Sequence, residues 1–259
     1  MIDIHCHILP NVDDGSKSLD ESIEMAKIAE SEGIKKIVNT SHYHPDFKFK
    51  KGKELIEIVK NFNDTLKTQG IDVEVVLGNE LYYTYDLIEN FDQLDFYSLN
   101  NSKYILIEFS PNNFPNNLVD IVYEIRLRKY IPILAHVERY PKIQSDPNII
   151  YDCINEGALI QINASSVVGK NGAEAKKTTK ILLDNDMVHF IATDAHSSTK
   201  RRPLIKETYD YIKKSYGEDI SQKLFLENQE YILNNKDLDF INPKKYVEKK
   251  SLFKRLFKR

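Results

Sequence analysis

The sequence predicts an α/β fold built on a parallel sheet, either open or closed into a barrel. Short apolar runs rich in β-branched residues recur along the chain, and helical patterns lie between them. Successive runs start roughly 27 to 37 residues apart, which is the length of a βα unit. No proline-, glycine- or serine-rich linker interrupts this alternation, so we expect one main domain.

Seven runs are expected to form strands: Ile2–His7, Lys36–Thr40, Val73–Gly78, Tyr104–Phe109, Ile131–His136, Ala158–Asn163 and Met187–Thr193. The clearest helix is Leu19–Gly33, because Ser18 and Glu21 form a capping-box pattern and a glycine closes the segment. Asp146 before Pro147 predicts a second helix start, and Arg202-Pro203 predicts a third.

Composition places the chain among ordinary globular proteins. Its 259 residues are 41% hydrophobic and 29% charged, and the net charge of −3 supplies no global basic field for nucleic acid. The amino terminus lacks a basic segment followed by an apolar one, and no apolar run approaches the roughly 18 residues of a membrane span. We therefore expect a cytoplasmic protein.

Several catalytic motifs are absent. Cys6 and Cys153 cannot form a disulfide framework, and Val12 and Leu159 stand where a Cys-x5-Arg phosphatase loop needs arginine. The glycines form neither a dinucleotide-binding pattern nor a Walker phosphate loop, and there is no G-x-S-x-G nucleophile elbow. These absences exclude the common thiol, serine and nucleotide-dependent chemistries.

The carboxyl-terminal residues differ in charge from the rest of the chain. Residues 244–259 carry eight Lys or Arg against Glu248, which gives +7 and leaves −10 for residues 1–243. In Ser251–Arg259 the apolar and basic side chains fall on opposite helical faces, a short basic amphipathic pattern. We therefore expect a catalytic domain, 1–243, and a tail, 244–259, that is either solvated or locally packed, or that contacts an anionic membrane or acidic partner.

Metal-ligand residue types collect at the carboxyl ends of the predicted strands. They occur in six segments, as His5, His7, Asp13 and Asp14; His42 and His44; Glu80; Glu108; His136; and Asp194 and His196. In a parallel barrel these ends converge on one face, where active sites are built. A mixed histidine and carboxylate set without thiolates suits Mn²⁺, Fe, Zn²⁺ or Mg²⁺, and so many ligands predict more than one ion.

These motifs resemble the polymerase and histidinol phosphatase (PHP) superfamily, and more narrowly the manganese-dependent protein-tyrosine phosphatases of bacterial capsule and exopolysaccharide loci. The matching segments are Asp3-Ile-His-Cys-His-Ile-Leu-Pro-x-x-Asp-Asp-Gly15, Thr40-Ser-His42, Gly78-Asn-Glu80, His136-Val-Glu-Arg-Tyr140 and Thr193-Asp-Ala-His196. Asn11 replaces a common glycine and Ser41 a common proline, but neither change removes a ligand. The resemblance spans roughly residues 1–235 and implies a distorted seven-stranded (β/α) barrel.

The resemblance also implies three metal sites. By motif position, His5, His7, Glu80 and Asp194 would hold the first ion, Asp14, His42 and His196 the second, and Glu80, Glu108 and His136 the third. The expected metal is Mn²⁺, with Fe, Zn²⁺ or Mg²⁺ as other occupants. Sharing of Glu80 would bring two ions close enough for one hydroxide to bridge them. Because this hydroxide would attack phosphorus without a protein nucleophile, we expect no phosphoenzyme.

Arginine would complete the site. Arg139 matches a phosphate-binding arginine of the family, whose planar fork can engage two phosphate oxygens. A second family arginine lies shortly after the Asp-x-His motif and before a proline. Arg201 and Arg202 both fit this place, and Arg202 is preferred because it adjoins Pro203. His42 is the expected catalytic histidine, with Tyr43 and His44 near enough in sequence to assist.

Some residues near the motifs keep two interpretations. Asp13 could replace Asp14 as a ligand, and His44 is either a polar contact of its loop or a substrate contact. Tyr82, Tyr83 and Tyr85 could line the cleft or simply pack. Cys6 and His189 are expected to be structural, because Cys6 alternates with two inward-facing histidines and His189 has the opposite strand parity to Asp194.

The resemblance implies hydrolysis of phosphotyrosine on a bacterial tyrosine autokinase that controls polysaccharide export. One alternative is a small-molecule phosphatase of the histidinol-phosphate type, with the same metals and a narrower pocket. A second alternative, from a different class, is a noncatalytic docking module that keeps the barrel. If the tail binds anionic lipid, the enzyme would lie at the inner face of the membrane.

Overall fold

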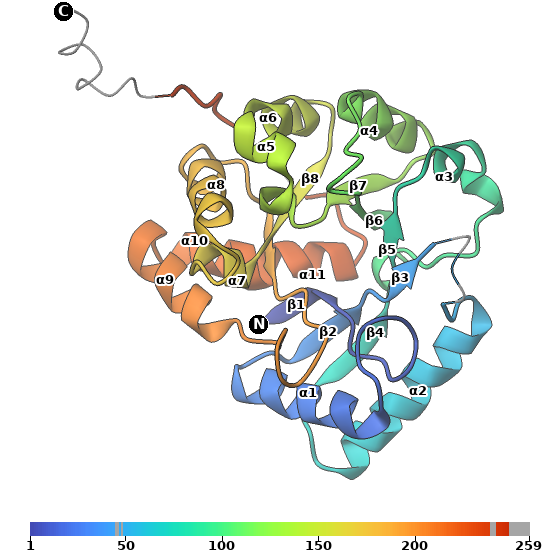
Figure 1. Ribbon diagram of the computed structural model, residues 1–259. Coiled ribbons are helices and arrows are strands. Elements are labelled where there is room, and N and C mark those ends of the chain that lie inside the picture. Colours follow the sequence, from blue (N-terminus) through green and yellow to red (C-terminus); the bar gives the residue numbers. More distant parts are fainter. Residues whose placement is uncertain (45–46, 48, 239–241, 249–259) are drawn as a thin grey trace, which may run out of the picture.

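Parallel strands occupy the centre of the molecule, and helices surround them (Figure 1). The structure is a computed structural model that describes residues 1–44, 47, 49–238 and 242–248. The strands are β1 Ile2–Cys6, β2 Lys36–Asn39, β3 His42–Tyr43, β4 Glu74–Leu77, β5 Glu80–Tyr82, β6 Tyr104–Glu108, β7 Ile131–Leu134, β8 Leu159–Asn163 and β9 Phe190–Ala192. The α/β class and the parallel pairing are therefore as predicted.

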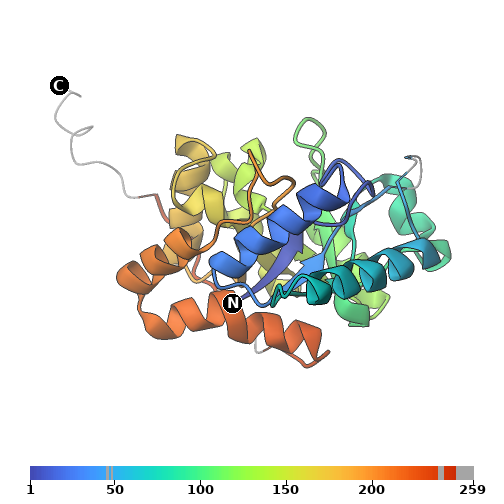
Figure 2. The same ribbon diagram turned by 90° about the horizontal axis from the view of Figure 1, so that it is seen from below.

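The α-helices mostly connect one strand to the next around the outside. They are α1 Leu19–Ser31, α2 Lys53–Thr68, α3 Tyr85–Glu89, α4 Leu118–Leu127, α5 Pro141–Ser145, α6 Asn148–Asn155, α7 Ala164–Val167, α8 Ala173–Asp184, α9 Lys206–Tyr216, α10 Glu218–Gln222 and α11 Asn228–Leu233. Figure 2 shows α9 and α11 beneath the strands, on the side where β1 begins. Within the described residues, no helix combines the length and apolar character that a membrane span requires.

The expected seven-stranded barrel is not confirmed, because the described strands form sheets of three and six strands and neither sheet closes. Their orders are β1-β2-β4 and β3-β5-β6-β7-β8-β9. The second and third predicted strands correspond to β2 and β4, and each is followed, after a break at residues 40–41 or 78–79, by a further short strand, β3 or β5, that the sequence did not predict. Asn79 explains the break, since its side-chain nitrogen donates to the Ser41 carbonyl at 2.8 Å and its backbone nitrogen donates to the Tyr97 carbonyl at 2.9 Å.

The two sheets nevertheless meet at β1 and β9. Cys6 and Ala195 form an isolated parallel bridge, and the backbone nitrogen of Asp194 donates to the His5 carbonyl at 2.8 Å. The buried Asp3 carboxylate accepts hydrogen bonds from the hydroxyl and the backbone nitrogen of Thr193. The carboxyl ends of the first and last strands are thereby held side by side.

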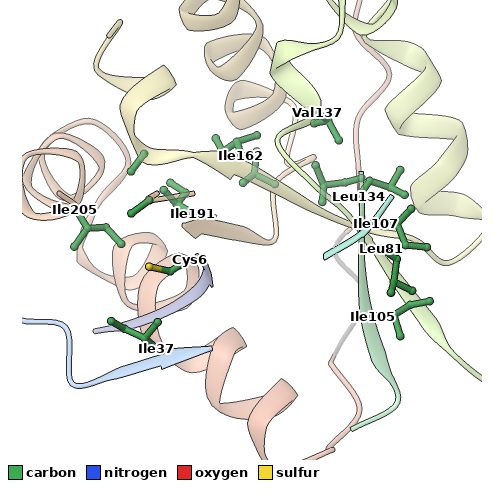
Figure 3. Close-up of a cluster of buried hydrophobic side chains, with 14 of the residues drawn as sticks. Cys6, Ile37, Leu81, Ile105, Ile107, Leu134, Val137, Ile162, Ile191 and Ile205 are labelled. Atoms are coloured by element: carbon green, nitrogen blue, oxygen red, sulfur yellow. The ribbon is translucent and has the colours of Figure 1, made fainter. Parts of the chain in front are cut away.

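Strand alternation divides the apolar interior into two clusters. Side chains of one parity, such as Ile105, Ile107 and Ile162, face the helices in the larger cluster (Figure 3). Side chains of the other parity form a second cluster that includes Tyr104, Leu106, Leu159 and Phe190, together with Ile2 of β1, Ile133 of β7 and Ile232 of α11. Further along the same strands, the positions of this second parity are occupied by the polar side chains Glu108, Gln161 and Asn163.

The helix ends test the local sequence signals. Helix α1 begins as predicted, because the Ser18 hydroxyl accepts from the Glu21 backbone nitrogen at 3.1 Å. The third predicted helix start, at Pro203, is wrong by three residues. Helix α9 begins at Lys206 because the Glu32 carboxylate accepts from the backbone nitrogens of Ile205 and Lys206, at 2.9 and 2.8 Å. This cap comes from a distant part of the chain.

The first residues of the predicted tail contact the domain. The Lys244 backbone nitrogen donates to the Asn185 carbonyl at 2.9 Å, and the Lys244 ammonium lies 2.6 Å from the Asp186 carboxylate. Asn148 exchanges two hydrogen bonds with the backbone of Tyr246. The amphipathic segment 251–259 lies outside the described residues, so membrane contact stays a prediction that binding of the full chain to anionic vesicles would test.

His189 predicts a pH dependence of stability. Its Nδ1 accepts from the Ile160 backbone nitrogen at 3.1 Å, and complete burial lowers the pKa of His189 to about 3. The unfolded chain takes up this proton near pH 6.5, so the folded state loses stability as the pH falls from 6.5 toward 3. At pH 5.5 the loss from this group is about 1.4 kcal/mol.

Urea unfolding at pH 7.5 and 5.5 measures this loss, with His189→Gln as the variant that keeps an acceptor but does not titrate. We expect the wild type to lose about 1.4 kcal/mol more than the variant between the two pH values. Equal losses in both proteins would show that His189 is not held neutral in the folded state.

Candidate metal centre

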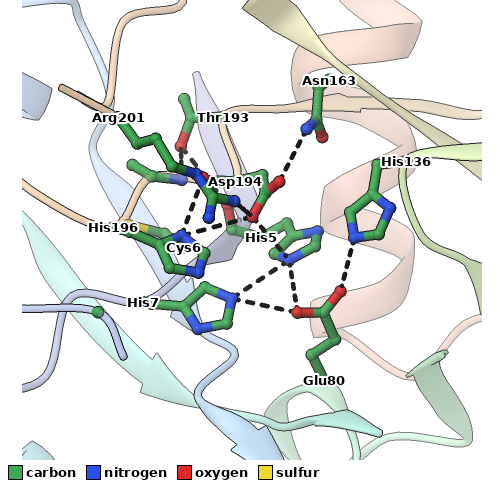
Figure 4. A network of polar contacts seen from close by, with 12 residues as sticks. His5, Cys6, His7, Glu80, His136, Asn163, Thr193, Asp194, His196 and Arg201 are labelled. Carbon is green, nitrogen blue, oxygen red and sulfur yellow. Dashed lines mark hydrogen bonds and ion pairs between the residues drawn. The ribbon is translucent and has the colours of Figure 1, made fainter. Parts of the chain in front are cut away.

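Glu80, at the start of β5, lies at the middle of a cluster of histidines (Figure 4). Its Oε2 is 3.2 Å from His5 Nε2 and 3.2 Å from His7 Nε2, and its Oε1 is 3.0 Å from His136 Nε2. The register β3–β5 places His42 directly beside Glu80, and His42 Nδ1 lies 3.3 Å from the same Oε2. One buried carboxylate thus faces four imidazoles from three segments of the chain.

Every predicted ligand belongs to a cluster whose donor atoms lie within 4.8 Å of one another. Four such clusters occur in the described part of the chain: His7, Asp14, His42 and His196; His5, His7 and Glu80; His5, His136 and Asp194; and His42, Glu80 and Glu108. The clusters share members, so neighbouring ions would share ligands. His42, rather than His136, groups with Glu80 and Glu108, so the grouping differs in detail from the implied sets.

The hydrogen bonds of the histidines suit cation binding. Gln161 Oε1 accepts the His136 backbone hydrogen at 2.8 Å, so His5 Nδ1, 3.1 Å from that oxygen, must donate to it. His7 Nδ1 lies 2.7 Å from the Asp13 carboxylate and donates likewise. When both imidazoles are neutral, the Nε2 atoms of His5 and His7 therefore carry lone pairs. These two nitrogens lie 3.4 Å apart, and both face the same Glu80 oxygen. Converging lone pairs require a cation or a proton between them.

The directions of the pKa shifts also show that this cluster requires positive charge. Burial raises the pKa of Glu80, but the charges and hydrogen bonds of His5, His136 and His7 outweigh it and hold the pKa well below its usual value. Burial lowers the pKa of His7, but Asp13 and Glu80 outweigh it and raise the pKa well above its usual value. Buried carboxylates here remain ionised only beside cations, and bound metal would supply that charge. The donor set therefore fits divalent metal.

Asp13 and Asp14 have different environments, which bears on the alternative that the sequence left open. Both Asp13 oxygens are engaged, Oδ2 by His7 Nδ1 and the His42 backbone nitrogen at 2.7 Å each, and Oδ1 by the Gly15 backbone nitrogen at 3.0 Å. Asp14 Oδ1 instead faces His42 Nε2 at 3.4 Å and His196 Nε2 at 3.6 Å. Asp13 orients His7, a predicted ligand, and Asp14 points into the cluster.

Sequence reasoning missed two residues of β8 that support the site. Gln161 contacts His5 and the His136 backbone, and its Nε2 donates to Asn163 Oδ1 at 2.9 Å. Asn163 Nδ2 then donates to Asp194 Oδ2 at 2.8 Å. This chain of amides orients three predicted ligands, as partners of metal ligands usually do. The available signal was the alternation of two amide residues in an otherwise apolar strand.

Two predicted ligands have a strained backbone. His136 has φ of 35° and Asp194 has φ of 53°, in the left-handed region that non-glycine residues seldom adopt. Such conformations cost about 1–3 kcal/mol and persist where surrounding contacts enforce them. Here those contacts include the Gln161 side chain at His136 and the His5 carbonyl at Asp194.

The arginines lie beside Asp194. Arg201 Nη2 is 2.6 Å from Asp194 Oδ1, and Arg139 Nη1 is 3.1 Å from Asp194 Oδ2. Both side chains are more than 40% exposed, so their guanidinium groups can reach a ligand as well. Arg202, which the sequence favoured over Arg201, lines the adjoining cavity but forms no ion pair with Asp194 or with any other described residue.

The neighbouring candidates separate into site and packing residues. Cys6 is buried in the larger apolar cluster, and the Tyr43 hydroxyl accepts from the Asp95 backbone nitrogen at 3.2 Å. Tyr83 packs on Phe109, with ring centres 5.3 Å apart. The His44 ring packs beside the Tyr82 ring, with ring centres 5.2 Å apart. The Tyr85 side chain is 71% exposed.

The roles of Asp13 and Asp14 can be separated by metal content. We expect Asp14→Ala to lose one bound ion after dialysis, because it removes a carboxylate that faces two histidines. Asp13→Asn should keep the wild-type ion number but bind Mn²⁺ about 10- to 100-fold more weakly, because it loosens His7. Elemental analysis and Mn²⁺ titration measure both quantities. Loss of an ion from Asp13→Asn alone would reverse the two roles.

A family model for capsular polysaccharide synthesis proteins of the CpsB/CapC type matches residues 1–234. CapC of Staphylococcus aureus is 37% identical over 257 residues, covering 98% of this chain and 99% of that protein. Tyrosine-protein phosphatase YwqE of Bacillus subtilis is 33% identical over 253 residues, covering 98% of this chain and 99% of that protein.

Solved structures of similar fold point to the same relatives. One from a study of YwqE of Bacillus subtilis and CpsB of Streptococcus pneumoniae, described as metal-dependent tyrosine phosphatases, matches with a TM-score of 0.90 and 32% identity, covering 96% of this chain and all of that one. Histidinol phosphate phosphatase of Lactococcus lactis matches at 0.56 and 14% identity, covering 83% and 93%, which shows a shared fold alone. By family match and near full-length identity, the chain belongs to the CpsB/CapC family of capsular polysaccharide synthesis proteins.

Proposed function

We propose that this protein is a metal-dependent protein-tyrosine phosphatase. The observation that carries the proposal is the convergence of nine histidine and carboxylate side chains beside two arginines. The names of the relatives YwqE and CpsB support it, because both are tyrosine-protein phosphatases. Phosphate-monoester hydrolysis needs an activated water and neutralisation of the phosphoryl charge, and this site offers groups for both.

The two cysteines do not supply a nucleophile. Burial raises the pKa of Cys6 well above its usual value, and burial also raises the pKa of Cys153 to about 12. Both thiols are protonated at neutral pH and lie in the apolar core. A thiol-phosphate route is therefore closed, and the proposed mechanism uses water as the nucleophile.

The chain's own residues divide the remaining work. His5, His7, Asp14, His42, Glu80, Glu108, His136, Asp194 and His196 would hold the ions. Bound divalent ions supply Lewis-acid charge neutralisation and an activated water. Arg139 and Arg201 bind the phosphoryl oxygens. Their ion pairs with Asp194 also orient that carboxylate. A tyrosine leaving group has a pKa near 10, so the demand for a general acid is modest. We assign His42 to metal binding, since both its ring nitrogens face carboxylates.

The finer parts of the proposal concern metal, partner and location. A histidine and carboxylate donor set suits Mn²⁺, and Fe, Zn²⁺ and Mg²⁺ fit the same donors. The proposed substrate protein is a phosphorylated bacterial tyrosine kinase in the cytoplasm, as the resemblance of the motifs implies; the family description names capsular polysaccharide synthesis. The net charge of −3 supplies no general attraction to nucleic acid.

The substrate class can be tested with metal-stripped protein and Mn²⁺ added back. We expect Mn²⁺-dependent hydrolysis of a phosphotyrosine peptide, and little hydrolysis of histidinol phosphate. His136→Ala should lose about 100-fold or more in kcat/KM, because it removes a donor beside Glu80. His189→Gln, which replaces a buried histidine outside the cluster, is the matched control and should retain activity.

Turnover of histidinol phosphate alone would keep the metal site and overturn the substrate. Absence of turnover on both, with full metal content, would favour a noncatalytic docking module.

The two candidate arginines can be separated with p-nitrophenyl phosphate, which carries only one anionic group. We expect Arg201→Ala to reduce kcat/KM by about 100-fold, because Arg201 lies against Asp194 at the cluster. Arg202→Ala should cost less than Arg201→Ala. Arg201→Lys keeps the charge without the planar fork, so it should recover only part of the loss. A larger loss from Arg202→Ala would restore the assignment that the sequence favoured.

A further inference from the structure

A basic cavity adjoins the metal centre. Its volume is about 450 Å³, and it lies between α7, the start of α9 and the loop that follows β9. Five cationic side chains line it: Arg139, Lys170, Lys200, Arg201 and Arg202. Asp194 also lines it, so the cavity is continuous with the cluster of predicted ligands.

The cavity concentrates positive charge on an acidic domain. Residues 1–243 carry a net charge of −10, yet the cavity has five cations and only two carboxylates, Asp194 and Glu207. Within the described residues, neither Lys200 nor Arg202 forms an ion pair. A concave surface lined by one sign of charge focuses the field on its occupant. The cavity therefore favours an anionic ligand.

The walls that carry these cations are held in place. On one side the Ser197 hydroxyl accepts from the backbone nitrogens of Lys200 and Arg201, at 3.1 Å each, and the Arg201 carbonyl accepts from His196 at 2.9 Å. On the other side the Lys170 backbone nitrogen donates to the Ser165 carbonyl at 2.8 Å. Little backbone freedom would be lost when an anion binds, so the cavity is preorganised.

The cavity is too large for one phosphate. A water molecule takes up about 30 Å³ of liquid, so a volume of about 450 Å³ has room for many more atoms than the five of a phosphate group. Of the five cations, only Arg139 and Arg201 contact Asp194 at the cluster. Lys170, Lys200 and Arg202 remain for a second group.

We propose that this cavity is a second anion subsite, which takes an acidic or phosphorylated residue of the same peptide as the scissile phosphotyrosine. The proposal rests on the phosphatase function and adds the sequence preference of its substrate. In an extended peptide, residues two apart point to the same side, roughly 7 Å from each other. One anionic side chain can then enter the cavity while the phosphotyrosine lies at the metal centre.

Glu207 opposes such a ligand. Its carboxylate lies 2.6 Å from the Lys170 ammonium, and both side chains are more than half exposed. Exposed pairs of this kind contribute little free energy, so an anionic residue can compete for Lys170. Removal of the Glu207 charge should therefore strengthen the subsite, which predicts an effect opposite in sign to removal of a lysine.

The test compares kcat/KM on three phosphotyrosine peptides and on p-nitrophenyl phosphate, with the Mn²⁺-loaded protein. One peptide has alanine at its flanking positions, the second has glutamate two residues to either side, and the third has a second phosphotyrosine there. We expect the wild type to prefer the anionic peptides by about 10-fold, and less in high salt. Comparison of the second and third peptides separates a carboxylate ligand from a phosphoryl ligand.

Three variants complete the test. Lys170→Ala combined with Lys200→Ala should reduce the anionic preference to about 2-fold and leave hydrolysis of p-nitrophenyl phosphate unchanged. Glu207→Gln should increase the preference. Lys60→Ala combined with Lys67→Ala, which removes two lysines from the exposed surface of α2, is the charge-matched control for the double variant and should change neither quantity.

The outcomes distinguish the two proposals. Equal turnover of neutral and anionic peptides, or a preference that survives the double lysine variant, would overturn the subsite while the phosphatase function stands. Absence of Mn²⁺-dependent turnover on every aryl phosphate would overturn the proposed function itself.

Discussion

The burial of the Glu80 carboxylate among histidines is the constraint on which the rest of the site depends. A carboxylate that is 1% exposed must be paired with positive charge or hydrogen-bond donors, because burial of an isolated charge is prohibitively costly. The histidines around it can supply that charge only if they are protonated or share a cation with it. Two of them are turned toward Glu80 by a neighbour, His5 by Gln161 and His7 by Asp13. The arrangement is complete only with positive charge at its centre, which is what metal binding provides.

The strands convert this local constraint into a precise site. Their apolar residues fill the interior below the cluster, so the same strand parity that packs Leu106 and Leu159 places Glu108 and Gln161 above them. Parallel registers then bring residues from distant parts of the chain side by side. A substitution in this interior cluster would therefore displace ligands as well as reduce stability, since both depend on the same strand positions.

Charge is distributed so that the metal centre and its surroundings attract anions although the domain is acidic. The negative charges of the ligands are compensated within the cluster and by Arg139 and Arg201, whereas the basic cavity beside them retains an excess of cations. An anionic peptide is therefore attracted to one concave region of a molecule that repels it elsewhere. This separation would give the enzyme selectivity through both its reactive centre and the adjoining surface.

The sequence by itself determined the α/β class, the parallel pairing, the start of α1 and the residue types that gather at strand ends, because periodicity, capping and strand parity are local properties. The resemblance of its motifs to a family, rather than any spacing, indicated the substrate. Only the tertiary structure decided the break at Asn79, the cap that Glu32 supplies to α9, the different environments of Asp13 and Asp14, and the contact of Arg201 with Asp194. These features depend on side-chain partners far apart in the chain, and no local pattern records which distant group a side chain will meet.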